Sequence, residues 1–90
     1  MSISVYIHST HRCHTDGNEV VVVEGDNVGE CLQAVADRYP EMRDKLFDDR
    51  GNLSKLLEIY VNLKSAHPDE LKKPVKAGDE IYVTLLLAGG

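Results

Sequence analysis

The sequence predicts a small α+β domain in which a mixed β-sheet packs against one main helix. Both ends of the chain alternate between apolar and polar residues, which is the period-two pattern of β-strands. Between them, apolar residues recur at helical spacing over residues 28–39. The chain has 90 residues, of which 42% are apolar and 28% charged. This length and composition suit a single globular domain over residues 1–90.

The N-terminal part predicts a β-hairpin. Residues 2–9 (SISVYIHS) alternate, and residues 19–25 (EVVVVEG) are rich in β-branched side chains, so both are expected to be strands. One face of the first strand carries Ile3, Val5 and Ile7. The segment CHTDGNE, with Asp16-Gly17 at its centre, predicts the turn that joins the two strands.

The main helix is predicted from an apolar stripe at positions i, i+4, i+7 and i+11, formed by Val28, Leu32, Val35 and Tyr39 with Cys31 beside them. Asn27 followed by Glu30 has the spacing of a reciprocal N-terminal cap. Pro40 ends this helix and suits the first position of a short second helix over residues 40–47.

Two further strands are predicted, at residues 56–63 (LLEIYVNL) and 80–87 (EIYVTLLL), with a polar segment between them that Pro68 and Pro74 interrupt. The element order is therefore ββαβ…β. The first and last strands are strongly patterned and are expected to lie side by side in the middle of the sheet. Their parallel pairing requires a crossover, which the helical region supplies, and this arrangement is a β-grasp.

Charge and composition exclude several classes of function. The net charge of −5 and pI of about 5.2 disfavour nucleic-acid binding and favour a protein partner with a basic docking surface. No stretch approaches the ~20 apolar residues of a membrane helix, and the N-terminus is too polar for a signal peptide. With only Cys13 and Cys31 there is no disulfide framework, so a cytoplasmic location is expected.

The C-terminal residues LLLAGG predict a reactive chain end. Leu86 and Leu87 cannot both point into the core of one strand, so they are expected to be anchors at the mouth of a partner's tunnel. Ala88 and Gly89 form a slim approach, and Leu85 to Gly90 span at most about 20 Å at ~3.3–3.6 Å per residue. A carboxyl group at Gly90, once joined to AMP, is an electrophile that sulfide converts into a thiocarboxylate.

The segment GDEIYVTLLLAGG resembles the end of the ThiS/MoaD family of ubiquitin-like sulfur carriers. The stretch EGDNVGECLQAVADRYPEMRDKLFDDRGNL is similar to the two helices and the following loop of that family, and IYVN to its next strand. HTDGNEVVVVEG is similar to the hairpin of the CysO-like branch, which is the closest match. The resemblance covers nearly the whole chain, although residues 64–76 diverge.

The resemblance implies a β-grasp fold with a flexible Gly-Gly tail over residues 86–90, and it assigns adenylation and thiocarboxylate formation to Gly90. It implies a carrier, not an enzyme, with no catalytic residues and no bound cofactor. ATP and Mg would be used by a ubiquitin-activating-type adenylating enzyme. The other implied partners are a sulfur donor, a downstream sulfur-accepting synthase and a metalloprotease that releases the product.

Several destinations for the sulfur stay open. Small subunits of molybdopterin synthase commonly have a proline-bearing stretch where this chain has Leu85 and Leu86, which weakens the molybdopterin assignment. The likeness of the hairpin to the CysO-like branch favours cysteine or a related sulfur amino acid. The alternatives are thiazole synthesis, molybdopterin synthesis, a ubiquitin-like protein modifier, and an interaction domain with an inert tail. The sequence also does not distinguish Gly90 as an original end from one exposed by trimming.

Other groups with chemical potential have simpler interpretations. His8, His11, Cys13 and His14 are metal-ligand types, but their spacing is not that of a standard zinc site. A solvated turn with a histidine capping its backbone is favoured, with no metal. Cys13 is interpreted as an incidental thiol, with a second sulfur-bearing group as the alternative, and Cys31 as a core residue. No Gly-rich phosphate loop or Ser-His-Asp order occurs.

Overall fold

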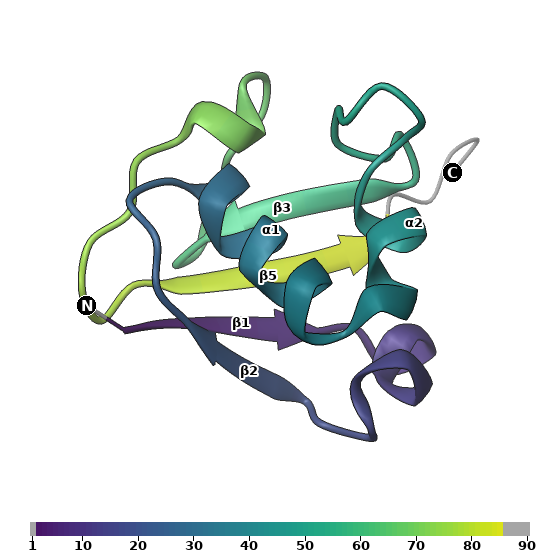
Figure 1. The fold of residues 1–90 in the computed structure, drawn as a ribbon. Coiled ribbons are helices and arrows are strands. Elements are labelled where there is room, and N and C mark those ends of the chain that lie inside the picture. Colours follow the sequence, from purple (N-terminus) through teal and green to yellow (C-terminus); the bar gives the residue numbers. More distant parts are fainter. Residues whose placement is uncertain (1, 86–90) are drawn as a thin grey trace.

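In the computed structural model, which describes residues 2–85, one helix crosses one face of a five-stranded mixed sheet (Figure 1). The strands lie in the order β2-β1-β5-β3-β4. Their bounds are Ile3–Ile7 (β1), Val20–Val23 (β2), Leu57–Val61 (β3), Lys64–Ser65 (β4) and Glu80–Leu85 (β5). The predicted β-grasp is confirmed.

The first and last strands form the centre of the sheet, as predicted. β1 and β5 are parallel, with Val5 opposite Ile81 and Ile7 opposite Val83, whereas every other strand pairing is antiparallel. The connection between them contains helix α1, which supplies the crossover that a parallel pair requires. β5 therefore has a neighbouring strand on each side, β1 and β3.

Helix α1 (Val28–Arg38) begins at the predicted cap. The Asn27 side-chain oxygen accepts a hydrogen bond from the Glu30 amide at 2.7 Å. The Glu30 carboxylate reaches back to the amide of Asp26 at 2.9 Å, one residue before the expected partner. Pro40 then opens the 3₁₀ helix η2 (Pro40–Met42), which continues into the single turn α2 (Arg43–Leu46).

The core lies between α1 and the sheet, and its members come from every major element. The buried apolar residues are Ile3, Val5, Ile7, Val21, Val23, Val28, Cys31, Leu32, Val35, Ala36, Met42, Leu46, Leu57, Ile59, Ala66, Val75, Ile81 and Val83. Alternate positions of each central strand point into this core, so the intervening positions form the opposite, open face of the sheet.

The connection between β1 and β2 differs from the short turn predicted. The 3₁₀ helix η1 (Ser9–Thr15) lies within it, so the prediction that the first strand extends to Ser9 is wrong. The buried Thr15 hydroxyl stabilises the end of η1 by reaching the carbonyls of Arg12 and Asn18, at 3.2 and 2.8 Å. This bonding pattern holds the loop compact and leaves it without strand geometry.

The predicted turn at Asp16-Gly17 follows η1, and both residues have positive φ, 55° and 81°. A left-handed backbone suits Gly and is tolerated by Asp, so this pair reverses the chain toward β2.

The polar segment between β3 and β5 also contains structure that was not predicted, namely β4 and the 3₁₀ helix η3 (Glu70–Lys72). Backbone hydrogen bonds fasten this segment to the start of α1, because the Val28 amide donates to Lys73 (2.9 Å) and the Val75 amide donates to Asp26 (3.0 Å). Within residues 2–85, no helix has the length and apolar character needed to cross a membrane.

Candidate functional site

The predicted site residues Leu86, Leu87, Ala88, Gly89 and Gly90 lie outside the described residues. The structure places the point from which they continue. Leu85, the last residue of β5, pairs with Leu57 of β3 and packs partly against the core. Because β1 and β5 are parallel, their carboxyl ends lie at the same end of the sheet (Figure 1). This end of β5 is the base of the predicted reactive segment.

The predicted histidine and cysteine cluster lies at the same end of the sheet, because η1 directly follows β1. η1 also packs against η2. His8 caps η1, and its ring nitrogen Nδ1 accepts a hydrogen bond from the Thr10 amide at 3.2 Å. The predicted histidine cap of the backbone is therefore confirmed.

The other two histidines of the cluster, His11 and His14, lie near each other. Burial, and next the neighbouring His14, lower the pKa of His11, and the two ring centroids are 6.2 Å apart. His14 faces Glu41 at 3.7 Å. Among residues 2–85, no three or more His, Cys, Asp or Glu side chains are grouped so that they could hold a metal ion.

The two cysteines are both free, but their surroundings differ. Cys31 is a fully buried core residue of α1, as predicted, and this burial raises the pKa of its thiol to about 11. A thiol with such a pKa is a poor nucleophile at neutral pH because little thiolate is present. Cys13 is exposed on η1.

Three tyrosines form a row across the open face of the sheet, which the sequence alone did not reveal. Tyr6 of β1 and Tyr60 of β3 are the direct register partners of Tyr82 on β5. The rings of Tyr6 and Tyr82 stack with centroids 4.6 Å apart and an interplanar angle of 8°. We call Tyr6, Tyr82 and Tyr60 the tyrosine row.

Two carboxylates fix the phenol groups of the tyrosine row. Glu80 accepts hydrogen bonds from Tyr6 at Oε2 (3.1 Å) and from Tyr82 at Oε1 (2.9 Å). Glu58 accepts one from Tyr60 at Oε1 (3.1 Å). These hydrogen bonds are the main reason that the pKa of each tyrosine is raised, since the carboxylate stabilises the protonated phenol.

Tyr82 and Thr84 line two shallow hollows on the open face. The first, of about 240 Å³, is lined by Tyr6 and Tyr82 and extends to His8 and Arg12. The second, of about 280 Å³, is bounded by Tyr60, Asn62 and Leu63. The Leu63 side chain is 89% exposed. An aromatic and partly apolar surface thus extends along β5 toward its carboxyl end.

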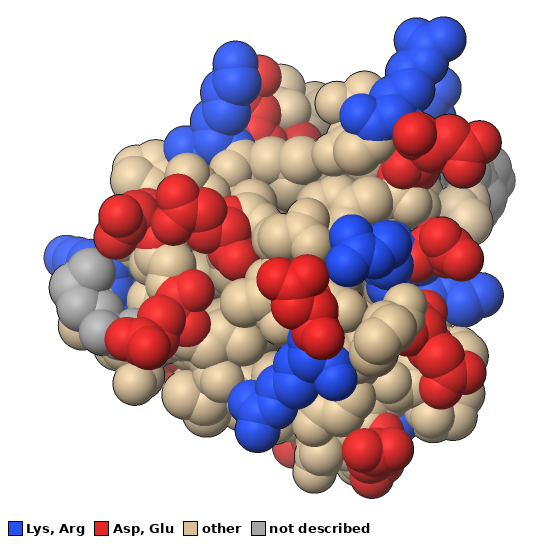
Figure 2. Space-filling view, viewed as in Figure 1, with Lys and Arg blue, Asp and Glu red and all other residues tan. Residues whose placement is uncertain are grey.

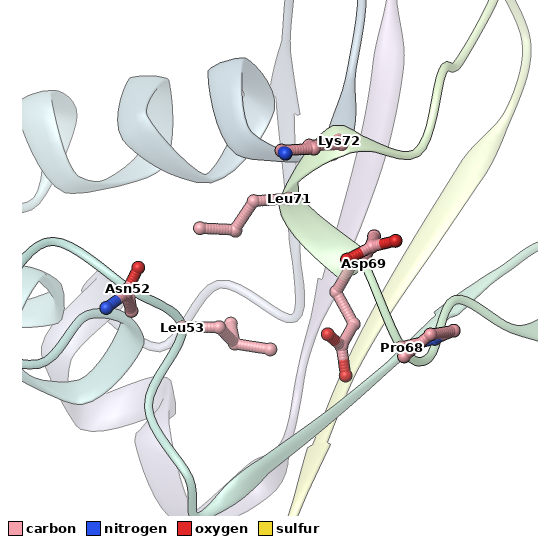
Figure 3. Close-up of a pocket in the computed structure, with 7 residues that line it drawn as sticks. Asn52, Leu53, Pro68, Asp69, Leu71 and Lys72 are labelled. Atoms are coloured by element: carbon pink, nitrogen blue, oxygen red, sulfur yellow. The ribbon is translucent and has the colours of Figure 1, made fainter.

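A separate pocket of about 300 Å³ lies between η3 and the loop before β3 (Figure 3). Figure 3 shows Leu53 and Leu71 extending into it from opposite walls, with Asp69 and Lys72 at its rim. Glu70 also lines it, and its carboxylate lies 3.3 Å from the ring nitrogen of His67. The pocket's described lining residues include no nucleophile paired with a base.

The helix-bearing face carries both charge signs. Figure 2 shows acidic and basic side chains interspersed on this face, without a continuous basic patch. Part of this mixture is an ion pair of 3.2 Å between Arg43 and Asp37. This face thus lacks the single-sign basic field that nucleic-acid binding requires.

A mixed sheet packed on one main helix, with the first and last described strands parallel at its centre, defines a ubiquitin-like β-grasp protein. The family model for ThiS matches residues 6–90. The chain therefore belongs to the ThiS family, which confirms the resemblance found in the sequence.

Individual relatives agree with this assignment. Sulfur carrier protein CysO of Mycobacterium tuberculosis is 28% identical over 93 residues, which cover 100% of both chains. A chain of the BexX/CysO complex of Amycolatopsis orientalis is 28% identical, with a TM-score of 0.87 over 98% of this chain and 99% of that chain. SAMP1 of Haloferax volcanii is 26% identical, with a TM-score of 0.82 over 100% of both chains.

Proposed function

We propose that the chain is a sulfur carrier in which the carboxyl group of Gly90 is adenylated and converted into a thiocarboxylate. The observation on which this proposal rests is the ThiS family match, which continues to residue 90 and includes the Ala-Gly-Gly segment. Similarity over the full length to proteins named sulfur carrier protein CysO supports the same role.

The geometry at the end of β5 supports presentation of the following residues to a partner. β5 lies between β1 and β3, and Leu85 at its end pairs with Leu57 of β3, so the sheet defines the point from which the chain continues. Residues 86–90 can extend at most about 17 Å from that point, given ~3.3–3.6 Å per residue. That span is sufficient for Gly90 to enter a cleft while the folded body stays outside it. Leu86 and Leu87 would contact the mouth of the cleft, with the slim Ala88 and Gly89 inside.

The chemistry takes place in an activating partner that binds Mg-ATP, and this chain is its substrate. The Gly90 carboxylate attacks the α-phosphorus of ATP, forming the acyl adenylate and releasing pyrophosphate. Hydrosulfide then attacks the acyl carbon, and AMP leaves with the electron pair of the broken carbon–oxygen bond. Glycine suits this position because no side chain obstructs the attack.

Cysteine or a related sulfur amino acid is the product that we favour, because the relatives matched over their full length carry the name CysO. The thiocarboxylate would react with an activated amino-acid precursor on a synthase, and a metalloprotease would release the product from the tail. The partners are thus an adenylating enzyme, a sulfur donor, a synthase and a protease, and the location is the cytoplasm.

The test is the intact mass of the purified chain after incubation with an adenylating partner, Mg-ATP and sulfide. The mass should rise by the difference between one sulfur and one oxygen atom. The same gain should occur in Cys13→Ser, which shows that the sulfur is not carried by that thiol. A persulfide on Cys13 would instead add the full mass of a sulfur atom, because no oxygen is lost. Deletion of Gly89 and Gly90 should abolish the gain. An unchanged wild-type mass with every adenylating partner tried would overturn the proposal.

A protein modifier is the second candidate, favoured by the similarity to SAMP1, a name that stands for small archaeal modifier protein 1. In that function a lysine amine of another protein would attack the activated Gly90 carbonyl. Covalent ladders that carry the chain on other proteins, and that vanish with the Gly89-Gly90 deletion, would favour the modifier over the sulfur carrier.

A further inference from the structure

We infer that the tyrosine row, with Glu58 and Glu80, is a docking surface that receives an arginine side chain of the activating partner. This inference rests on the proposed function for the identity of the partner. The choice of arginine rests on the open face of the sheet, where three aromatic rings and two carboxylates lie on neighbouring strands.

The carboxylates of this surface have no cationic partner of their own. Glu58 and Glu80 form no ion pair within residues 2–85, and the side-chain hydrogen bonds that their carboxylates accept come from neutral phenols. Within the same residues, Glu58 Oε2 has no hydrogen-bond partner. Arg12, the one Lys or Arg among the described residues that line the two hollows, pairs with Glu19 at 3.1 Å and donates to the Ile7 carbonyl at 3.0 Å.

An uncompensated acidic surface that also bears aromatic faces selects for arginine. A guanidinium is planar and weakly hydrated, so it stacks on a tyrosine ring while its N–H groups pair with a carboxylate. A lysine ammonium satisfies the charge but lacks the stacking geometry and is more strongly hydrated. The hollows on either side of Tyr82 offer space for such a side chain next to a ring.

The position of the surface relates docking to the proposed reaction. Thr84 lines both hollows and lies one residue before Leu85, from which the reactive segment continues. A partner seated on the tyrosine row is therefore within the span of residues 86–90. The net charge of −5 also favours association with a basic partner surface.

The direct test uses a small probe and does not depend on activation. N-acetyl-arginine amide is titrated into ¹⁵N-labelled chain, and amide shifts are followed. We expect saturable shifts on β1, β3 and β5 around the tyrosine row, and weaker ones with N-acetyl-lysine amide. The variant Glu58→Gln/Glu80→Gln removes both negative charges, keeps one acceptor oxygen at each position and should lose the shifts. The variant Asp26→Asn/Asp69→Asn, which removes two exposed acidic charges elsewhere, should keep them.

Equal shifts with the lysine amide, or unchanged shifts in Glu58→Gln/Glu80→Gln, would overturn the inference. With an adenylating enzyme of the source organism, the double glutamine variant should raise KM in ATP–pyrophosphate exchange about tenfold and leave kcat unchanged. The control variant should match the wild type in both constants.

The two proposals fail in distinguishable ways. A chain truncated after Ala88 should support no exchange but should inhibit exchange of the full chain competitively, because it keeps the docking surface. Absence of exchange with the full chain would contradict the proposed function, and the arginine-amide titration would still decide the docking surface. The truncated chain is also tested with Glu58→Gln/Glu80→Gln. If this variant inhibited exchange as strongly as the truncated chain without the two substitutions, the docking surface would be contradicted and the proposed function would not.

Discussion

The carbonyl oxygen of Leu71 lies 2.9 Å from the position that a β-carbon on Gly29 would occupy. Gly29 is in the first turn of α1, and Leu71 is in η3, so two segments distant in sequence meet there without an intervening side chain. This contact explains a glycine inside a helix, where glycine is ordinarily unfavourable.

Gly29→Ala should therefore destabilise the protein. The helix would gain up to about 1 kcal/mol in propensity, but the new methyl group meets backbone at 2.9 Å and forces η3 to shift. We expect a net loss of about 1–2 kcal/mol in the free energy of unfolding, measured by urea denaturation. Gln33→Ala, on the exposed side of the same helix, should stay within about 0.5 kcal/mol of wild type. A stabilised Gly29→Ala would contradict the packing described.

Asn27→Ala should remove the cap of α1. The Glu30 amide would lose its 2.7 Å acceptor, and the expected cost is about 1 kcal/mol in the free energy of unfolding. Asn27→Asp and Asn27→Ser keep a side-chain oxygen and should recover most of that loss in the same urea experiment. If the alanine and aspartate variants were equally stable, the side-chain cap would contribute nothing measurable.

Part of the fold follows from local pattern, as the cap at Asn27 illustrates. The cap at Asn27 and the parallel pairing of the first and last strands were predicted because they depend on short-range spacing and on chain topology. η1 and η3 were not predicted. The local hydrogen bonds of the buried Thr15 hydroxyl and the tertiary bond from Val28 to Lys73 leave no periodic trace in the sequence.

The candidate site also has one part that the sequence predicted and one that it did not. The reactive tail was predicted from residue type and from family resemblance, and it stays a prediction, since residues 86–90 lie outside those described. The tyrosine row was missed. Alternation placed Tyr6 and Tyr82 away from the core, but their stacking depends on strand register, which is set by pairing between strands that are far apart in the sequence.

The thiols of Cys13 and Cys31 should react at very different rates. Cys31 is buried and its pKa is about 11, so at mildly alkaline pH it is protonated and inaccessible, whereas Cys13 is exposed. Native protein should take up one equivalent of iodoacetamide rapidly, and Cys13→Ser should take up none until it is unfolded in denaturant. Rapid labelling of native Cys13→Ser would show that α1 opens readily over the core.

Glu80 should control the alkaline titration of two tyrosines. Its hydrogen bonds raise the pKa values of Tyr6 and Tyr82 above their ordinary value of 10.0. Because the folded state favours the protonated phenols, this contribution to stability is present below pH ~10 and is lost as the pH rises through the folded pKa values. Glu80→Gln should therefore move both tyrosinate transitions toward lower pH, as read from ultraviolet absorbance.

Tyr60 is the internal control for that titration, because its phenol is bonded to Glu58. Its transition should stay in place in Glu80→Gln and move to lower pH in Glu58→Gln, with Tyr6 and Tyr82 showing the reverse pattern. Replacing each tyrosine in turn by Phe assigns the transitions. If all three tyrosines moved together in either variant, a general loss of negative charge would account for the effect, and the specific pairing of each carboxylate with its phenols would be refuted.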